Sequence, residues 1–145
     1  MKLTAESVLG GVGDALRDQF LPHIADEFAA SSARMAQSLI AIVALGMDDA
    51  VAIRVEEHAR IRELLGTGAG LVEPGELAAR LREAAASRDP GLTISALDRE
   101  STRLRALLVT LHAWTEEQDS PAARALDQAI WRALRDFEMA RRPRA

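Results

Sequence analysis

One helical stripe constrains the fold of this chain more than any other feature. Between residues 24 and 46, apolar and small side chains recur every three or four positions, which is the spacing of one face of an α-helix. They are Ile24, Phe28, Ser31, Met35, Leu39, Ile42 and Gly46. Residues 39–45 are apolar on all sides, so this segment must be covered on its back as well as its front. We expect a second layer of helices or a second subunit to cover it.

The helical period continues through the rest of the chain, and no segment alternates for long enough with the period of two that a strand requires. Apolar positions from Ile94 to Thr115 alternate in steps of three and four, which predicts a second long helix at 94–118. Thr4 is a candidate N-cap, and Ser120 before Pro121 is a strong start signal for the last helix. The sequence therefore predicts an all-α protein, an antiparallel bundle of about six helices with long members at 24–46 and 94–118.

The length of 145 residues matches one ordinary domain. We therefore predict a single helical domain over residues 1–145. The glycine-rich run at 66–75 is the one convincing loop, and residues 141–145 are predicted to form a basic C-terminal tail.

Charge and composition argue against several functional classes. The net charge of −4 does not suit a protein that neutralises nucleic-acid phosphates. The chain has no cysteine, which excludes disulfides and thiolate zinc sites and is compatible with an intracellular location. Its longest uncharged stretch, 35–47, is shorter than the roughly 20 residues that span a bilayer. We predict a cytoplasmic protein with no nucleic-acid partner and no membrane helix.

No enzyme motif is found in the sequence. The glycines at 66–70 follow a helical pattern and not a strand, and the only lysine is Lys2, so a phosphate-binding loop is not predicted. A Gly-x-Ser-x-Gly elbow is absent. His58 falls on an apolar stripe, where a hydrogen-bonded histidine at the edge of the core is a simpler interpretation than a catalytic base. We predict a non-catalytic protein with no cofactor.

Two histidines have a glutamate four residues further on, which places both side chains on one helix face. These pairs are His23 with Glu27 and His112 with Glu116. Imidazole and carboxylate groups are metal ligands, so convergence of the two pairs would create a metal site. Surface histidines beside a glutamate are the alternative interpretation, and the Glu-x-x-His pattern of di-iron bundles is absent.

Two tryptophans lie beside the main stripes of their helices. Trp114 and Trp131 could widen the core or anchor a partner, because large amphipathic side chains serve both purposes. Together with the apolar segment 39–45, they suggest more apolar helix surface than one small bundle needs. Self-association as a homodimer is the economical explanation, with Ile40, Ala44, Trp114 and Trp131 as the candidate contacts.

About the first half of the chain resembles a known protein family. The segments that carry the resemblance are 16–22, 28–46, Glu57-His58-Ala59-Arg60 and Leu64-Leu65-Gly66. They are similar to an all-helical bacterial family of unknown function, often encoded beside aminoglycoside-phosphotransferase-like kinases and acyl-CoA dehydrogenases. The resemblance implies a helical accessory protein with an enzyme partner in an acyl-CoA or phosphotransfer system. Our leading hypothesis is therefore a self-associating interaction or accessory protein, and the alternative is a bundle that binds a metal or small ligand.

Overall fold

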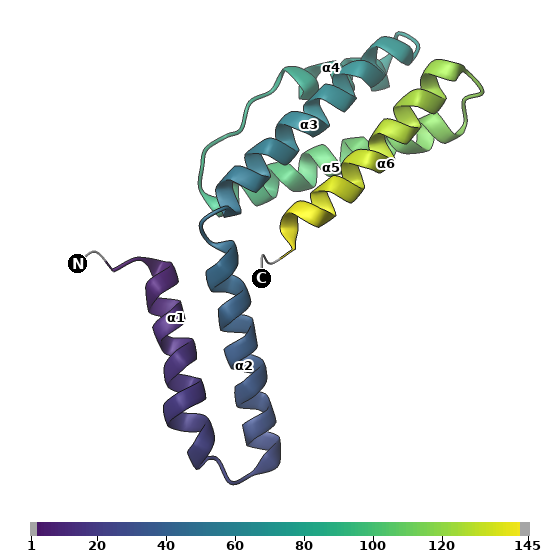
Figure 1. Cartoon of the computed structure of the whole chain (residues 1–145). Coiled ribbons are helices and arrows are strands. Elements are labelled where there is room, and N and C mark those ends of the chain that lie inside the picture. The colour runs from purple at the N-terminus through teal and green to yellow at the C-terminus, as the bar shows by residue number, and fades with distance from the viewer. Residues whose placement is uncertain (1–2, 143–145) are drawn as a thin grey trace. The chain divides into compact units, whose positions relative to one another are not determined.

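The computed structural model describes residues 3–142 of the chain. These residues form six α-helices and no strand, which confirms the predicted all-α class (Figure 1). The helices are α1 (Ala5–Ala15), α2 (Glu27–Gly46), α3 (Ala50–Leu71), α4 (Glu76–Ala86), α5 (Ile94–Glu116) and α6 (Pro121–Arg141). The long helices predicted at 24–46 and 94–118 correspond to α2 and α5, and α3 and α6 are of similar length.

Contacts along the chain group the described residues into two compact units, 3–50 and 51–142, whereas the sequence predicts one domain. In the N-terminal unit, α1 and α2 pack against each other as a helical hairpin (Figure 1). A π-helical turn, Leu16–Phe20, and a 3-10 turn, Leu21–His23, connect them. The predicted cap is present, because the Thr4 side chain accepts a hydrogen bond from the Ser7 amide.

The stripe that we expected to be packed in the bundle lies on the exposed side of α2. Phe28 and Met35 keep 82% and 66% of their surface, and Leu39 and Ile42 are also exposed. The opposite face of α2 packs on α1, where a Cβ at Gly13 would contact Ile40 at 3.7 Å. Small residues explain this choice, because buried Gly13, Ala30 and Ala44 let the two backbones approach closely.

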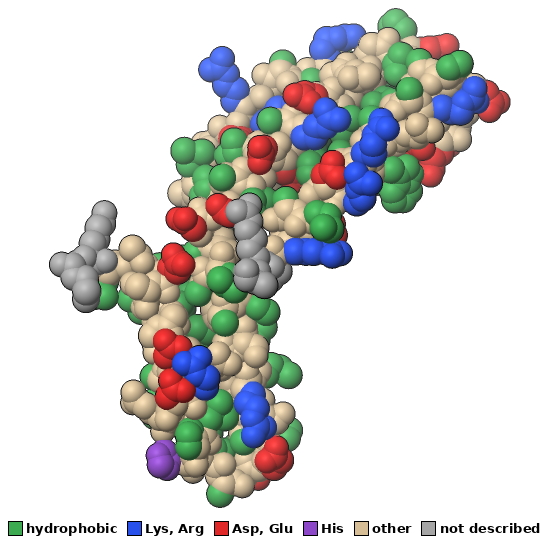
Figure 2. All heavy atoms as spheres, viewed as in Figure 1, with side chains coloured by type: hydrophobic (Ala, Val, Ile, Leu, Met, Phe, Trp, Pro, Cys, Tyr) green, Lys and Arg blue, Asp and Glu red, His purple; other side chains and the backbone are tan. Residues whose placement is uncertain are grey.

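The exposed apolar surface also makes α2 comparable to a membrane helix. It is the one helix among residues 3–142 whose length and composition would allow it to cross a bilayer, with a mean hydropathy of 1.4. The sequence predicts no membrane helix because Arg34 limits the uncharged run to residues 35–47. Figure 2 shows hydrophobic side chains on the surface along α1 and α2.

The C-terminal unit contains the hydrophobic core. Helices α3 to α6 contribute aliphatic side chains and one aromatic side chain, Phe137, to a single cluster. Its completely buried members are Ile61, Leu65, Leu81, Leu104, Leu111 and Ile130. Thr93 and Ser120 cap α5 and α6 through hydrogen bonds to the amides of Ala96 and Ala123, and Pro121 is the first residue of α6 as expected.

The predicted loop at 66–75 is mostly wrong, because α3 continues to Leu71. Gly68 faces α5 so closely that a Cβ there would lie 2.5 Å from a methyl carbon of Leu111. The glycine therefore permits helix packing and does not mark a turn. Of the predicted basic tail at 141–145, Arg141 ends α6, and residues 143–145 lie outside the described part of the chain.

Gly68 and Gly70 provide a matched test of this packing. We expect Gly68→Ala to lower the free energy of unfolding by about 1–3 kcal/mol, because Leu111 is fully buried and has no room to move. Gly70→Ala should raise it by about 0.5–1 kcal/mol, since nothing lies near its Cβ position and alanine favours the helix. Urea unfolding followed by circular dichroism measures both. Equal effects of the two substitutions would contradict this role for Gly68.

Candidate functional site

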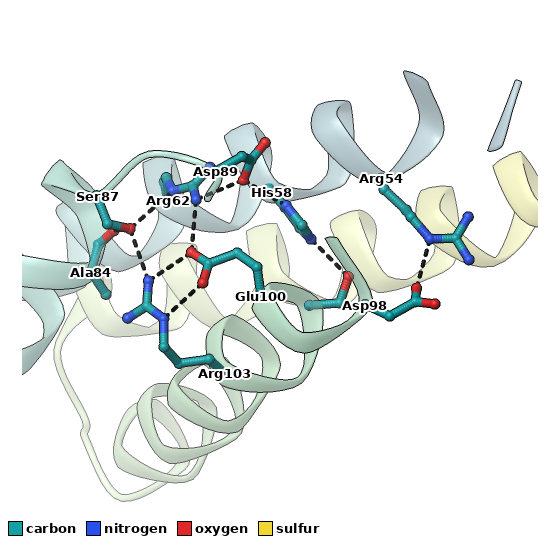
Figure 3. A network of polar contacts seen from close by, with 10 residues as sticks. Arg54, His58, Arg62, Ala84, Ser87, Asp89, Asp98, Glu100 and Arg103 are labelled. Atoms are coloured by element: carbon teal, nitrogen blue, oxygen red, sulfur yellow. Dashed lines mark hydrogen bonds and ion pairs between the residues drawn. The ribbon is translucent and has the colours of Figure 1, made fainter. Parts of the chain in front are cut away.

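A buried polar network connects α3 with α5 and with the segment that follows α4 (Figure 3). His58 of α3 is at its centre and is completely buried. Its Nδ1 lies 2.8 Å from Oδ1 of Asp89, and its Nε2 lies 2.7 Å from Oγ of Ser101. A carboxylate only accepts hydrogen bonds, so in the neutral ring Nδ1 donates to Asp89 and Nε2 accepts from the serine hydroxyl. His58 is thus the hydrogen-bonded histidine that the sequence favoured, but it lies inside the bundle and not at its edge.

The order of hydroxyl, imidazole and carboxylate is the same as in serine hydrolases. A hydrolase also needs an accessible hydroxyl and backbone donors for the oxyanion. Ser101 is only 7% exposed. It lies within α5, where backbone N–H groups are used by the helix itself. The geometry therefore supports a structural role, in which His58 satisfies polar groups of two other segments.

Charged side chains extend the network toward the surface. The Arg62 Nη2 atom lies 2.8 Å from Asp89 Oδ1 and 2.8 Å from Glu100 Oε1. Arg103 donates two hydrogen bonds to the Glu100 carboxylate, from Nη2 to Oε1 at 2.7 Å and from Nε to Oε2 at 2.9 Å. Ser87 accepts hydrogen bonds from both arginines. The network thus joins α3, α5 and the segment after α4 by charge-assisted hydrogen bonds.

These contacts lower the pKa of the carboxyl groups of Glu100, which is buried, and Asp89, which is partly buried. For Glu100, the hydrogen bond from Arg103 is the largest cause of the lowered pKa and outweighs the opposing effect of burial. For Asp89, burial by itself raises the pKa, but hydrogen bonds from Arg62 and His58 together outweigh it. Both groups therefore favour the charged form in the folded protein.

A second ion-pair cluster is centred on Glu57, which is 2% exposed. Its Oε1 accepts a hydrogen bond from Arg105 Nε of α5 at 2.6 Å, and its Oε2 accepts one from Arg141 Nη2 of α6 at 2.8 Å. The Arg105 guanidinium also lies over the ring of Phe137, 6.0 Å from its centre. One side chain of α3 thereby holds two other helices.

A cavity of about 340 Å³ opens between α3 and α6 beside this cluster. Its lining combines apolar residues with Glu56, Glu57, Arg60 and Asp136. The volume falls within the range of small-ligand pockets, but the charged walls do not match an acyl chain.

The predicted metal ligands do not form the arrangement that the spacing suggested. His23 ends the 3-10 turn, and the chain is extended at Ile24 before α2 begins at Glu27. His23 and Glu27 are therefore not one turn apart on a helix. Asp26 causes this break, since its side chain accepts a 2.7 Å hydrogen bond from the Ala29 amide and caps α2. His23 and Glu27 belong to the N-terminal unit, whereas His112 and Glu116 belong to the C-terminal unit.

His112 and Glu116 do lie together on α5, and α6 adds a third group. Potential ligand atoms of His112, Glu116 and Asp127 all lie within 4.8 Å of one another. His112 Nε2 is 2.9 Å from Asp127 Oδ1. The sequence analysis missed Asp127, because its approach depends on how α6 packs on α5.

The predicted interface residues have different surroundings. Ile40 and Ala44 lie on the side of α2 that faces α1, where Ile40 is half-buried and Ala44 is buried. Trp114 packs against the hydrophobic core as a partly buried residue. Trp131 is 57% exposed and meets the His112 ring nearly perpendicularly, with 5.0 Å between ring centres. The sequence analysis left open whether a second helical layer or a second subunit covers the apolar segment 39–45, and Leu39 and Ile42 of this segment are exposed.

Comparisons with protein-family models, with curated proteins and with solved structures find no match for this chain. The family resemblance described above therefore stays a prediction.

The two lowered pKa values predict acid sensitivity. A carboxyl group with a lowered folded-state pKa stabilises the protein above its ordinary pKa, here 3.8 for Asp89 and 4.5 for Glu100. This stability is lost as the pH falls through the folded-state values. We expect the urea midpoint to be constant near neutral pH and to drop progressively below pH 4.5. A midpoint that stays constant as the pH falls well below 3.8 would contradict the network's contribution.

Glu57→Gln tests the second cluster. Glutamine keeps the shape but removes the charge that faces Arg105 and Arg141, so we expect a loss of about 2 kcal/mol in the free energy of unfolding. Glu56→Gln is the matched control, because Glu56 is the exposed neighbour on the same helix. Its effect should stay within about 0.5 kcal/mol. Thermal and urea unfolding of both variants give the comparison, and similar losses would count against a special role for Glu57.

Proposed function

We propose that this chain is a helical interaction protein that self-associates through the exposed face of α2. We define the outer stripe as Phe28, Met35, Leu39 and Ile42. The observation that carries the proposal is that this stripe has helical spacing and is exposed, while the opposite face of the same helix packs on α1. Contiguous exposed apolar surface of this kind marks interaction sites in soluble proteins.

A second copy of the hairpin is the occupant that fits the stripe best. Steps of seven, four and three residues between its members match the a and d positions of a helical seam. The hairpin has no core of its own, since Gly13, Ala30 and Ala44 are its only buried residues between positions 3 and 46. Two hairpins related by a two-fold axis would pair their α2 helices and bury both stripes at once.

The size of the surface supports the same occupant. Val43, Leu45 and Met47 of the same helix end are also exposed and add apolar surface near the stripe. A stable protein interface buries on the order of 800 Å² on each partner, which a face of several large side chains can supply.

Charges on both helices disfavour a membrane as the occupant. Arg34 lies inside α2, and its guanidinium group pairs with Glu27 at 3.3 Å. An arginine at the centre of a membrane helix costs about 2.5–3.5 kcal/mol. On α1 and the turn after it, Asp14 and Asp18 are exposed and pair with Arg17. A protein partner accommodates these groups at the solvated rim of the interface.

The C-terminal unit would act as the stable bundle attached to this interaction module. An enzyme of an acyl-CoA or phosphotransfer system as a further partner remains a prediction, because only the sequence resemblance implies it.

Self-association is tested with Leu39→Asp. Wild-type protein at tens of micromolar should have twice the 15.7 kDa chain mass by size exclusion with light scattering. Each dimer loses two buried leucines in the variant, so we expect dissociation to become at least about 100-fold more favourable. The variant should then elute as a monomer with unchanged helicity.

Leu92→Asp is the matched control. Leu92 is 68% exposed in the segment before α5, so the same chemical change there should leave the dimer intact. A monomeric wild-type protein would overturn the proposal, as would a Leu39→Asp variant that remains dimeric. Sedimentation of a monomeric wild-type protein with neutral phosphatidylcholine vesicles would identify the membrane as the occupant instead.

A further inference from the structure

The group formed by His112, Glu116 and Asp127 has the chemistry of a transition-metal site. We infer that these three side chains bind one divalent ion of the Zn²⁺ class at the junction of α5 and α6. One imidazole nitrogen and two carboxylate groups suit such an ion in a chain that has no cysteine. The inference is independent of self-association through α2.

The elements hold the three ligands from two directions. His112 and Glu116 are one turn apart on α5, which places them on one face. Asp127 comes from α6, which packs against α5. Ligand atoms around a tetrahedral Zn²⁺ lie about 3.4 Å apart, because each bond is about 2.1 Å long. The observed separations of up to 4.8 Å therefore need only a small inward movement of the exposed Glu116 side chain.

An unsatisfied buried nitrogen points to a missing ligand. His112 Nε2 is buried and has no hydrogen-bond partner among the described residues. It lies 2.9 Å from Asp127 Oδ1, yet the two groups are not aligned for a hydrogen bond. Buried polar atoms without a partner are rare, and an ion or a water is a usual explanation. A cation that contacts both atoms would satisfy the nitrogen and separate it from the carboxylate.

The surroundings favour a cation and hold the histidine ring in place. The negative end of the α5 dipole is here, and its last turn carries no basic residue. Asp119 adds further negative charge close by in the sequence. Trp131 contacts the His112 ring edge to face, which limits its rotation. The Thr115 hydroxyl lies 3.4 Å from Asp127 Oδ1, as an outer partner of a ligand would.

A metal ion would enter the site from the solvent side, where Glu116 is exposed. His112 and Asp127 are half-buried, whereas Glu116 is exposed, so the site is open to solvent on one side. Three protein ligands leave a fourth position of a tetrahedral ion for water.

The experiment is calorimetric titration of tag-free protein with ZnCl₂. We expect one saturable Zn²⁺ per chain. His112→Ala and Glu116→Gln should each weaken binding by at least about tenfold, the smallest loss found when even an outer partner of a metal ligand is removed. Trp131 reports on the same site, so its fluorescence should change on titration, and that change should disappear in Trp131→Phe.

Two controls match the two ligand variants. His23→Ala removes another histidine, and Glu117→Gln removes the carboxylate next to Glu116; both should keep the wild-type affinity. Glu116 is exposed, so its variant retains the fold and carries the test even if His112→Ala is unstable. Absence of a saturable site would overturn the inference. Equal weakening by Glu116→Gln and Glu117→Gln would also overturn it, because that pattern indicates nonspecific attraction to acidic groups.

Discussion

The C-terminal bundle depends on the satisfaction of polar groups that are buried between α3 and its neighbours. His58 and Glu57 are adjacent in α3, point in different directions and have almost no exposed surface. Burial of such groups is unfavourable unless every donor and acceptor has a partner. Ser101 and Asp89 satisfy His58, whereas Arg105 and Arg141 satisfy Glu57. A shift of any one helix would leave a buried charge or ring nitrogen unpaired, so these contacts fix the register of the bundle.

The N-terminal hairpin has the opposite character. Its helices meet through small residues, and its large apolar side chains face outward. The two units thus differ in their packing. The C-terminal unit has a satisfied core, whereas the hairpin keeps large apolar side chains exposed. This difference is the physical reason for assigning an interaction function to α2 and for seeking a ligand at the unsatisfied atom of the C-terminal unit.

Local signals in the sequence predicted helix starts well, because a cap depends on residues only a few positions apart. The predicted caps Thr4 and Ser120 both act as N-caps. The glycine-rich run 66–75 led to a wrong prediction of a loop. Gly68 instead allows close packing against Leu111, which lies 43 positions further along the chain. Only part of the candidate metal site could be predicted from the sequence, again because one of its contacts joins two different helices. His112 and Glu116 share a helix face by spacing alone, but Asp127 reaches them only through the packing of α6 on α5.

The sequence by itself determined that the chain is helical and which residues share each face of α2, because both follow from the period of the α-helix. Only the tertiary structure decided which of those faces is covered. Apolar side chains indicate that a face can be buried, but shape decides which neighbour covers it. The small residues on the back of α2 fit against Gly13 of α1. The outer stripe, which dominates the sequence pattern, therefore stays exposed.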